Sequence, residues 1–244
     1  MPLTKRWTSQ AKFSQSIENI TSGNETDPAS VTLEKFKLMK KCGVVVAFLL
    51  TSVFLYAQNS KELTQKGREL FEKREYMEAL LNLNMAIEMD KGYSPAYYLR
   101  GNIKDSFDDR HGAMKDYNTA IERNPKFADA FFARGNVKMK LQDYYGAIAD
   151  FTSAIKLNEN YVEAYLNRGK AKQFLQAYED AINDCSKIIN IKPDSFDAWF
   201  LRGILRIDFG DSINGCLDLS KAGELGDLKA YEVIREKCNH KTAD

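Results

Sequence analysis

Between residues 60 and 227 the apolar residues recur with the period of amphipathic helices, in segments of about 12 to 14 residues. Short polar turns join these segments in pairs and read "KREY", "DDRHG", "LQDYYG", "LQAYE" and "FGDS". No alternating run of apolar and polar residues bounded by turn residues indicates a β-strand. Only five prolines occur, which also favours helix. The pattern predicts an all-α protein built from helical hairpins.

Small residues mark the same points of every hairpin. Glycine recurs every 34 residues, at Gly67, Gly101, Gly135, Gly169 and Gly203. Twelve residues after each glycine comes another small residue: Ala79, Ala113, Ala147, Ala181 or Gly215. A bulkier side chain at either point would overpack the seam between the two helices. We therefore expect the glycine of each first helix to face the small residue of the second.

These residues resemble the tetratricopeptide repeat (TPR) family. Units are numbered from the first residues of 60–93, 94–127, 128–161, 162–195 and 196–227. The family's aromatic at position 4, glycine at 8, alanine at 20, aromatic at 24 and alanine at 27 then line up. Departures are the basic residues at positions 7 and 11, and a fifth unit with Gly215 for alanine and Asp227 for proline. The resemblance implies a right-handed superhelical solenoid, which residues 228–244 close with a cap helix and tail.

The resemblance also implies a concave groove, lined by the first helices, that holds an extended peptide or a partner helix. The candidate groove residues, at positions 5 and 9, are Tyr98, Asn102, Phe132, Asn136, Lys170 and Phe200. Asparagine offers donors and an acceptor to a peptide backbone. The aromatics either contact the partner or only seal the helix packing. The subclass that grips C-terminal carboxylates needs lysine at position 5 of its first units, where this chain has Thr64 and Tyr98.

Opposite charges repeat with the same period. Arginine occupies position 7 and aspartate position 23 of units 2 to 5: Arg100, Arg134, Arg168, Arg202, and Asp116, Asp150, Asp184, Asp218. These residues lie level with each other in an antiparallel hairpin. They form either a ladder of structural ion pairs or an anion-binding stripe of arginines. As exposed pairs they would each contribute about 0–1 kcal/mol.

The net charge, the motifs and the cysteines limit the kinds of function that the sequence indicates. The formal net charge of +1 does not indicate nucleic acid. No catalytic motif, metal-ligand pattern or cofactor fingerprint occurs, so we expect no enzyme activity, no metal and no cofactor. Cys185 replaces a core aromatic. Cys216 and Cys238 lie where the fifth unit meets the cap helix, and are either a disulfide, in an oxidising compartment, or two buried thiols.

The stretch "MKKCGVVVAFLLTSVFLYAQNS" (39–60) carries no charge from Cys42 to Ala57. Its 16 residues would span about 24 Å as a helix, short of a hydrocarbon core of about 30 Å. With Lys40 and Lys41 before it, the segment 39–57 reads as a signal peptide cleaved near Ala57. The alternative is an uncleaved signal-anchor, a transmembrane helix with the repeats outside the cytoplasm; a cytoplasmic protein is a third reading.

Residues 1–38 read as a polar, disordered extension, and either Met1 or Met39 is the true start. The sequence as a whole predicts a monomeric, non-enzymatic scaffold in the periplasm or cell envelope, whose groove binds a protein or peptide. It would touch membrane only through 42–57. Alternatives are a membrane-anchored assembly factor, a non-catalytic subunit of an envelope enzyme complex, or an enzyme with an unrecognised site.

Overall fold

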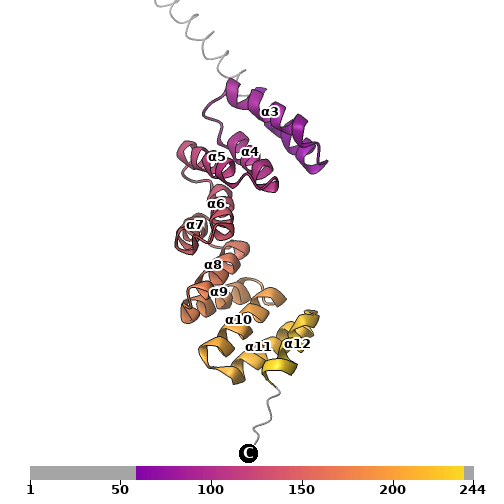
Figure 1. Cartoon of the computed structure of the whole chain (residues 1–244), viewed down its shortest axis with the longest axis vertical. Coiled ribbons are helices and arrows are strands. Elements are labelled where there is room, and N and C mark those ends of the chain that lie inside the picture. The colour runs from indigo at the N-terminus through magenta and orange to yellow at the C-terminus, as the bar shows by residue number, and fades with distance from the viewer. Residues whose placement is uncertain (1–58, 239–244) are drawn as a thin grey trace, which may run out of the picture. The chain divides into compact units, whose positions relative to one another are not determined.

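The computed structural model describes residues 59–238, and these residues form helices and no strand. A helical segment over 59–72 comes first. It is followed by α3 (Tyr76–Met89), α4 (Ser94–Ser106), α5 (Arg110–Arg123), α6 (Ala128–Lys140), α7 (Tyr144–Leu157), α8 (Val162–Phe174), α9 (Tyr178–Ile191), α10 (Phe196–Phe209), α11 (Ser212–Glu224) and α12 (Leu228–Lys237). From α3 onward each helix packs against the next in the chain (Figure 1). The expected all-α solenoid of hairpins is confirmed. The predictions about residues 1–38 and about the apolar segment lie outside the described residues.

Each hairpin closes through one residue with a left-handed backbone. These residues stand at position 15 of the five units: Arg74 (φ 65°), Asp108 (φ 61°), Gln142 (φ 62°), Gln176 (φ 58°) and Gly210 (φ 100°). The following residue is the N-cap of the second helix, and in three units it is an aspartate, at Asp109, Asp143 or Asp211. Its carboxylate accepts a hydrogen bond from the backbone N–H three residues on. This cap satisfies a donor that the first helical turn leaves free.

The glycine seam is closer than the sequence indicates. A Cβ on Gly135 would lie 2.7 Å from Cε1 of Phe151, the aromatic at position 24. Gly101 faces Tyr117 in the same way, at 2.6 Å. The small residue at position 20 is therefore not the nearest neighbour in these two units. The glycines make room for the large side chain at position 24 of the facing helix.

Alanines at positions 27 and 3 join one hairpin to the next. All of these alanines are fully buried, and each pair belongs to one core cluster: Ala86 with Ala96, Ala120 with Ala130, and Ala154 with Ala164. Two methyl groups take little space, so the first helix of each unit packs closely against the second helix of the unit before. In the first unit position 3 is the exposed Glu62, and position 10, elsewhere buried and apolar, is the exposed Glu69. The described repeats thus begin with a polar face, as terminal repeats do.

The cap helix α12 covers the last hairpin. Ala230 is fully buried in a cluster with Leu219 and Ala222 of α11. The chain joins α12 to α11 a second time through a disulfide between Cys216 and Cys238, whose Cα atoms are 6.0 Å apart. Among residues 59–238, no helix is both long enough and apolar enough to cross a bilayer.

Candidate partner-binding groove

The arginines at position 7 are held by three helices at once. In the third unit Arg134 donates from Nε to Asp150 Oδ2 at 2.9 Å and from Nη2 to Oδ1 at 2.6 Å. Its Nη1 donates to Asn118 Oδ1 of the preceding hairpin at 2.7 Å. The guanidinium also lies over the ring of Phe131, with 5.6 Å between Cζ and the ring centroid. The same pattern repeats in the second, fourth and fifth units, with Asn84, Thr152 and Ser186 as the third acceptor.

The aspartates of this ladder each face two cations. Lys138 Nζ lies 2.8 Å from Asp150 Oδ2. The basic residues at position 11 of the other three units likewise pair with the aspartate of their own unit: Lys104 with Asp116, Lys172 with Asp184 and Arg206 with Asp218. The aspartates are buried, with Asp150 only 3% exposed. The expectation of exposed pairs is therefore wrong: these are buried, bidentate pairs inside a network. Because the guanidinium nitrogens are already bonded, the interpretation as structural pairs fits and an open anion-binding stripe does not.

The aromatic groove candidates pack against their own hairpin. The ring centroid of Tyr98 lies 5.0 Å from that of Phe127, and the centroid of Phe132 lies 4.9 Å from that of Tyr161. Both candidates are half-buried, on α4 and α6. They close the hairpin and leave one part of each ring at the surface, so both roles that the sequence left open are compatible with the geometry.

The two asparagines are oriented by internal hydrogen bonds. Tyr117 donates its hydroxyl to Asn102 Oδ1 at 2.8 Å, and Asn167 Nδ2 donates to Asn136 Oδ1, also at 2.8 Å. Burial raises the pKa of Tyr117, so its hydroxyl keeps the proton that it donates. Neither Asn102 nor Asn136 donates from its own Nδ2 within residues 59–238. Each amide therefore presents donors, one repeat apart, and keeps its acceptor inside.

The last two candidates differ in exposure. Lys170 lies on α8 with an exposed side chain. Phe200 lies half-buried on α10 and packs on the cluster that also receives α12. The groove candidates thus all lie on first helices, and the fifth unit's candidate shares its cluster with the cap.

Two kinds of hydrogen-bond partner in this region could not be predicted from the sequence. Nothing in the repeat pattern assigns the third acceptor at position 25, because it changes from asparagine to threonine to serine along the chain. The bond between Tyr117 and Asn102 joins positions 24 and 9, which the pattern treats as core and surface. A signal was present only for the third acceptor, since a polar residue stands 16 residues before each ladder arginine.

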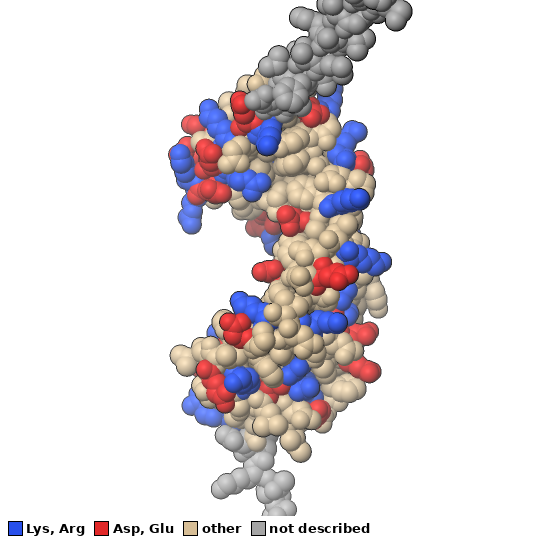
Figure 2. All heavy atoms as spheres, turned by 180° about the vertical axis from the view of Figure 1, so that it is seen from behind, with Lys and Arg blue, Asp and Glu red and all other residues tan. Residues whose placement is uncertain are grey.

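The remaining candidate chemistry is limited. Cys185 is fully buried, and burial raises the pKa of its thiol to about 12, so it stays protonated at neutral pH. No cluster of potential metal ligands occurs in the described part of the chain. On the face in Figure 2, acidic and basic side chains are interspersed rather than gathered into a patch of one sign.

Comparison with family models identifies the repeats. A model described as "Tetratricopeptide repeat" matches residues 94–127 and 162–195, and one described as "TPR repeat" matches residues 135–173. The matched repeats are tetratricopeptide repeats, which generally act as scaffolds that bind proteins or peptides. No curated protein sequence matches the chain.

Solved structures share the fold at low sequence identity. YrrB, described as "a TPR protein with an unusual peptide-binding site", is 22% identical with a TM-score of 0.64, over 71% of this chain and 90% of that one. MamA from Desulfovibrio magneticus RS-1 is 18% identical with a TM-score of 0.63, over 68% and 94% of the two chains. TTC0263 from Thermus thermophilus is 16% identical with a TM-score of 0.54, over 73% and 98%. These likenesses concern the fold alone.

Proposed function

We propose that the protein is a non-enzymatic scaffold that binds an extended peptide along the first helices α4, α6 and α8. The observation that carries the proposal is the pair of outward amide donors on Asn102 and Asn136. An extended strand offers carbonyl oxygens at regular intervals, and main-chain hydrogen bonds would supply affinity that does not depend on the peptide's side chains. The exposed parts of Tyr98 and Phe132 would add apolar contact. The peptide-binding site that names YrrB is consistent with this use of the fold.

Replacing both asparagines with aspartate tests the donors without disturbing the hairpins. Asn102→Asp and Asn136→Asp keep an oxygen for Tyr117 and Asn167 but remove the outward N–H groups. A neutral hydrogen bond contributes about 0.5–1.5 kcal/mol, so we expect the double variant to bind about tenfold more weakly or worse. The probe is a peptide selected from a random-sequence library on the full-length wild-type chain, measured by fluorescence anisotropy.

The matched control carries the same two new charges elsewhere. Asn183 and Asn190 are exposed on α9, a second helix, so Asn183→Asp with Asn190→Asp should leave affinity unchanged. Both double variants should keep the helical circular dichroism spectrum of the parent. Equal affinity of the Asn102/Asn136 variant and the wild type would remove these amides from the site.

We further propose that the repeats work outside the cytoplasm. The disulfide between Cys216 and Cys238 supports this, because such bonds persist in oxidising compartments. The charge-free run 42–57 after Lys40 and Lys41 is the second support. The mass of the chain purified from its own cells tests both: a chain starting at Gln58 with the disulfide intact is expected. A reduced chain from the cytoplasmic fraction would reject export.

A further inference from the structure

The second helix of the first unit, α3, carries an uncovered apolar stripe. Met77, Leu81, Met85 and Met89 follow one another at intervals of four residues and are 80%, 61%, 42% and 39% exposed. Residues four apart lie on the same side of a helix, so the four side chains form one row. The row runs over 13 residues, from Met77 to Met89, and its ends are about 18 Å apart along the helix.

The same four positions are polar in α5 and mostly polar in α9, whereas α7 and α11 keep some exposed apolar residues there. In α5 they are His111, Lys115, Thr119 and Arg123. In α9 they are Glu179, Asn183, Lys187 and Ile191. In α7 they are Tyr145, Ala149, Ser153 and Leu157, and in α11 and its C-cap they are Ile213, Leu217, Lys221 and Leu225. The repeat architecture therefore does not require a complete apolar row here, and of the five units only the first is apolar at all four positions. Contiguous exposed apolar surface of this kind marks interaction sites.

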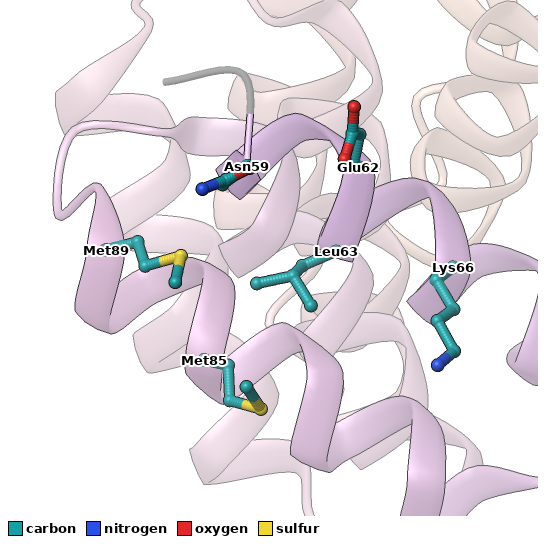
Figure 3. Close-up of a pocket in the computed structure, with 6 residues that line it drawn as sticks. All are labelled: Asn59, Glu62, Leu63, Lys66, Met85 and Met89. Carbon is teal, nitrogen blue, oxygen red and sulfur yellow. The ribbon is translucent and has the colours of Figure 1, made fainter. Parts of the chain in front are cut away.

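An open pocket adjoins the stripe. It has a volume of about 300 Å³ and is lined by Asn59, Glu62, Leu63, Lys66, Met85 and Met89. Figure 3 shows Met85 and Met89 from α3 facing Leu63 from the helical segment 59–72 across it. Position 4 is Leu63 here, whereas the other units have a larger aromatic ring. Position 7 is Lys66 instead of a ladder arginine, so the space that Arg134 and Phe131 fill in the third unit is open.

The charged residues on α3 itself are acidic, whereas Lys73, Arg74 and Lys91 lie in the turns at its two ends. Glu78 and Glu88 are exposed on α3, which contains no lysine or arginine. Across the pocket, Glu62 is exposed and Lys66 is the single basic residue among the lining residues. A partner that covers the stripe would place its own flanking side chains beside these carboxylates. Lysine or arginine in those places would be attracted to them.

We propose that this surface, α3 together with the pocket beside Leu63, docks a basic amphipathic helix of another protein. The partner's apolar row would lie along Met77, Leu81, Met85 and Met89, with one large side chain in the pocket. Methionine is flexible and polarisable, which suits it to a helix-binding surface. This site lies on α3 and the helical segment 59–72 of the first unit, whereas the proposed peptide groove lies on α4, α6 and α8.

The charges also discriminate against the other occupants. A two-fold contact between two copies would bring the same acidic flanks together, and like charges repel. A helix that lies on a lipid surface is typically rich in lysine and arginine on its polar face, and α3 has none. A basic helix of another protein satisfies both the apolar row and the carboxylates.

Binding of two model helices tests the proposal. The probes are fluorescein-labelled amphipathic peptides of the same pattern, one of leucine and lysine and one of leucine and glutamate. The full-length chain should bind the leucine–lysine helix saturably and the leucine–glutamate helix at least about tenfold more weakly, a difference of about 1.4 kcal/mol. Leu81→Gln with Met85→Gln should weaken binding of the leucine–lysine helix by a similar factor. Glu78→Gln with Glu88→Gln should weaken it and reduce its dependence on salt.

The matched control places the same glutamines at the same repeat positions in other units. Asn183→Gln with Thr119→Gln should bind like the wild type, and circular dichroism should find every variant equally helical. Undetectable binding by the wild type, or equal binding of both peptides or of the Leu81/Met85 variant, would overturn the proposal. Two further results would also overturn it: self-association of the wild type, or its binding to phosphatidylglycerol vesicles, if the Leu81/Met85 variant loses that property. The stripe would then serve a second copy of the chain or a lipid surface.

Discussion

Replacing Asp150 with alanine should lower the free energy of unfolding by about 3–5 kcal/mol, the loss typical of breaking one side of a buried ion pair. The carboxylate is 3% exposed, and it accepts from Arg134 while Lys138 lies 2.8 Å away. Without it, two cations remain whose side chains are only 19% and 18% exposed. Arg134 cannot turn fully to solvent, because it is also fixed between Asn118 and Phe131. Urea unfolding followed by circular dichroism measures the loss.

The first unit provides the matched control for this substitution. Its position 23 is Asn82, which bonds only to the backbone of Glu78 on its own helix. Asn82→Ala should therefore cost less than about 0.5 kcal/mol, the usual range for a surface substitution. A loss below about 1 kcal/mol for Asp150→Ala would contradict the buried network and restore the picture of exposed, weak pairs.

Replacing Gly135 with alanine should cost about 1–3 kcal/mol, because the new methyl group would overpack the seam. Its Cβ would stand 2.7 Å from the ring of Phe151. That ring is fully buried, and its centroid lies 5.8 Å from that of Phe132, so it has little room to withdraw. Either the ring or one of the two helices has to shift.

Gly169 occupies the same position of the next unit and should respond in the opposite direction. Cys185 replaces the ring there, and a Cβ on Gly169 would find its nearest neighbour, Leu201 Cδ2, at an ordinary 3.5 Å. Gly169→Ala should then stabilise the protein by about 0.5–1 kcal/mol, the advantage of alanine over glycine inside a helix. Thermal melting of both variants checks the pair; equal shifts would contradict the account of the seam.

The hairpins could be predicted from the sequence because they depend on local information. Side-chain size at Gly135 and Ala147, helical periodicity and the turn residues all act within one unit. The first helices α4, α6, α8 and α10 accordingly begin at the first residues of units 2 to 5. The repetition strengthens the prediction, because the same pattern of residues occurs in several units.

The chemistry of the ladder could be predicted only in part. Level pairing of Arg134 and Asp150 follows from the hairpin, but the further bond of Arg134 depends on a third helix, α5, which brings Asn118 beside the guanidinium. Likewise, which atoms of Asn102 face outward depends on a hydroxyl of the facing helix. The exposed stripe on α3 could not be predicted from the sequence, because the spacing of apolar residues does not tell which helix face remains exposed in the fold.

Photo-crosslinking from one unit tests the central claim most directly, namely that the partner lies along the first helices. Benzoylphenylalanine is placed at Lys170 of α8 or, in a second variant, at Lys187 of α9; both side chains are exposed in the same hairpin. With the selected peptide bound to the full-length chain, we expect crosslinks from position 170 and none above background from position 187. Crosslinks from 187 alone, or equally from both, would contradict a peptide site on the first helices.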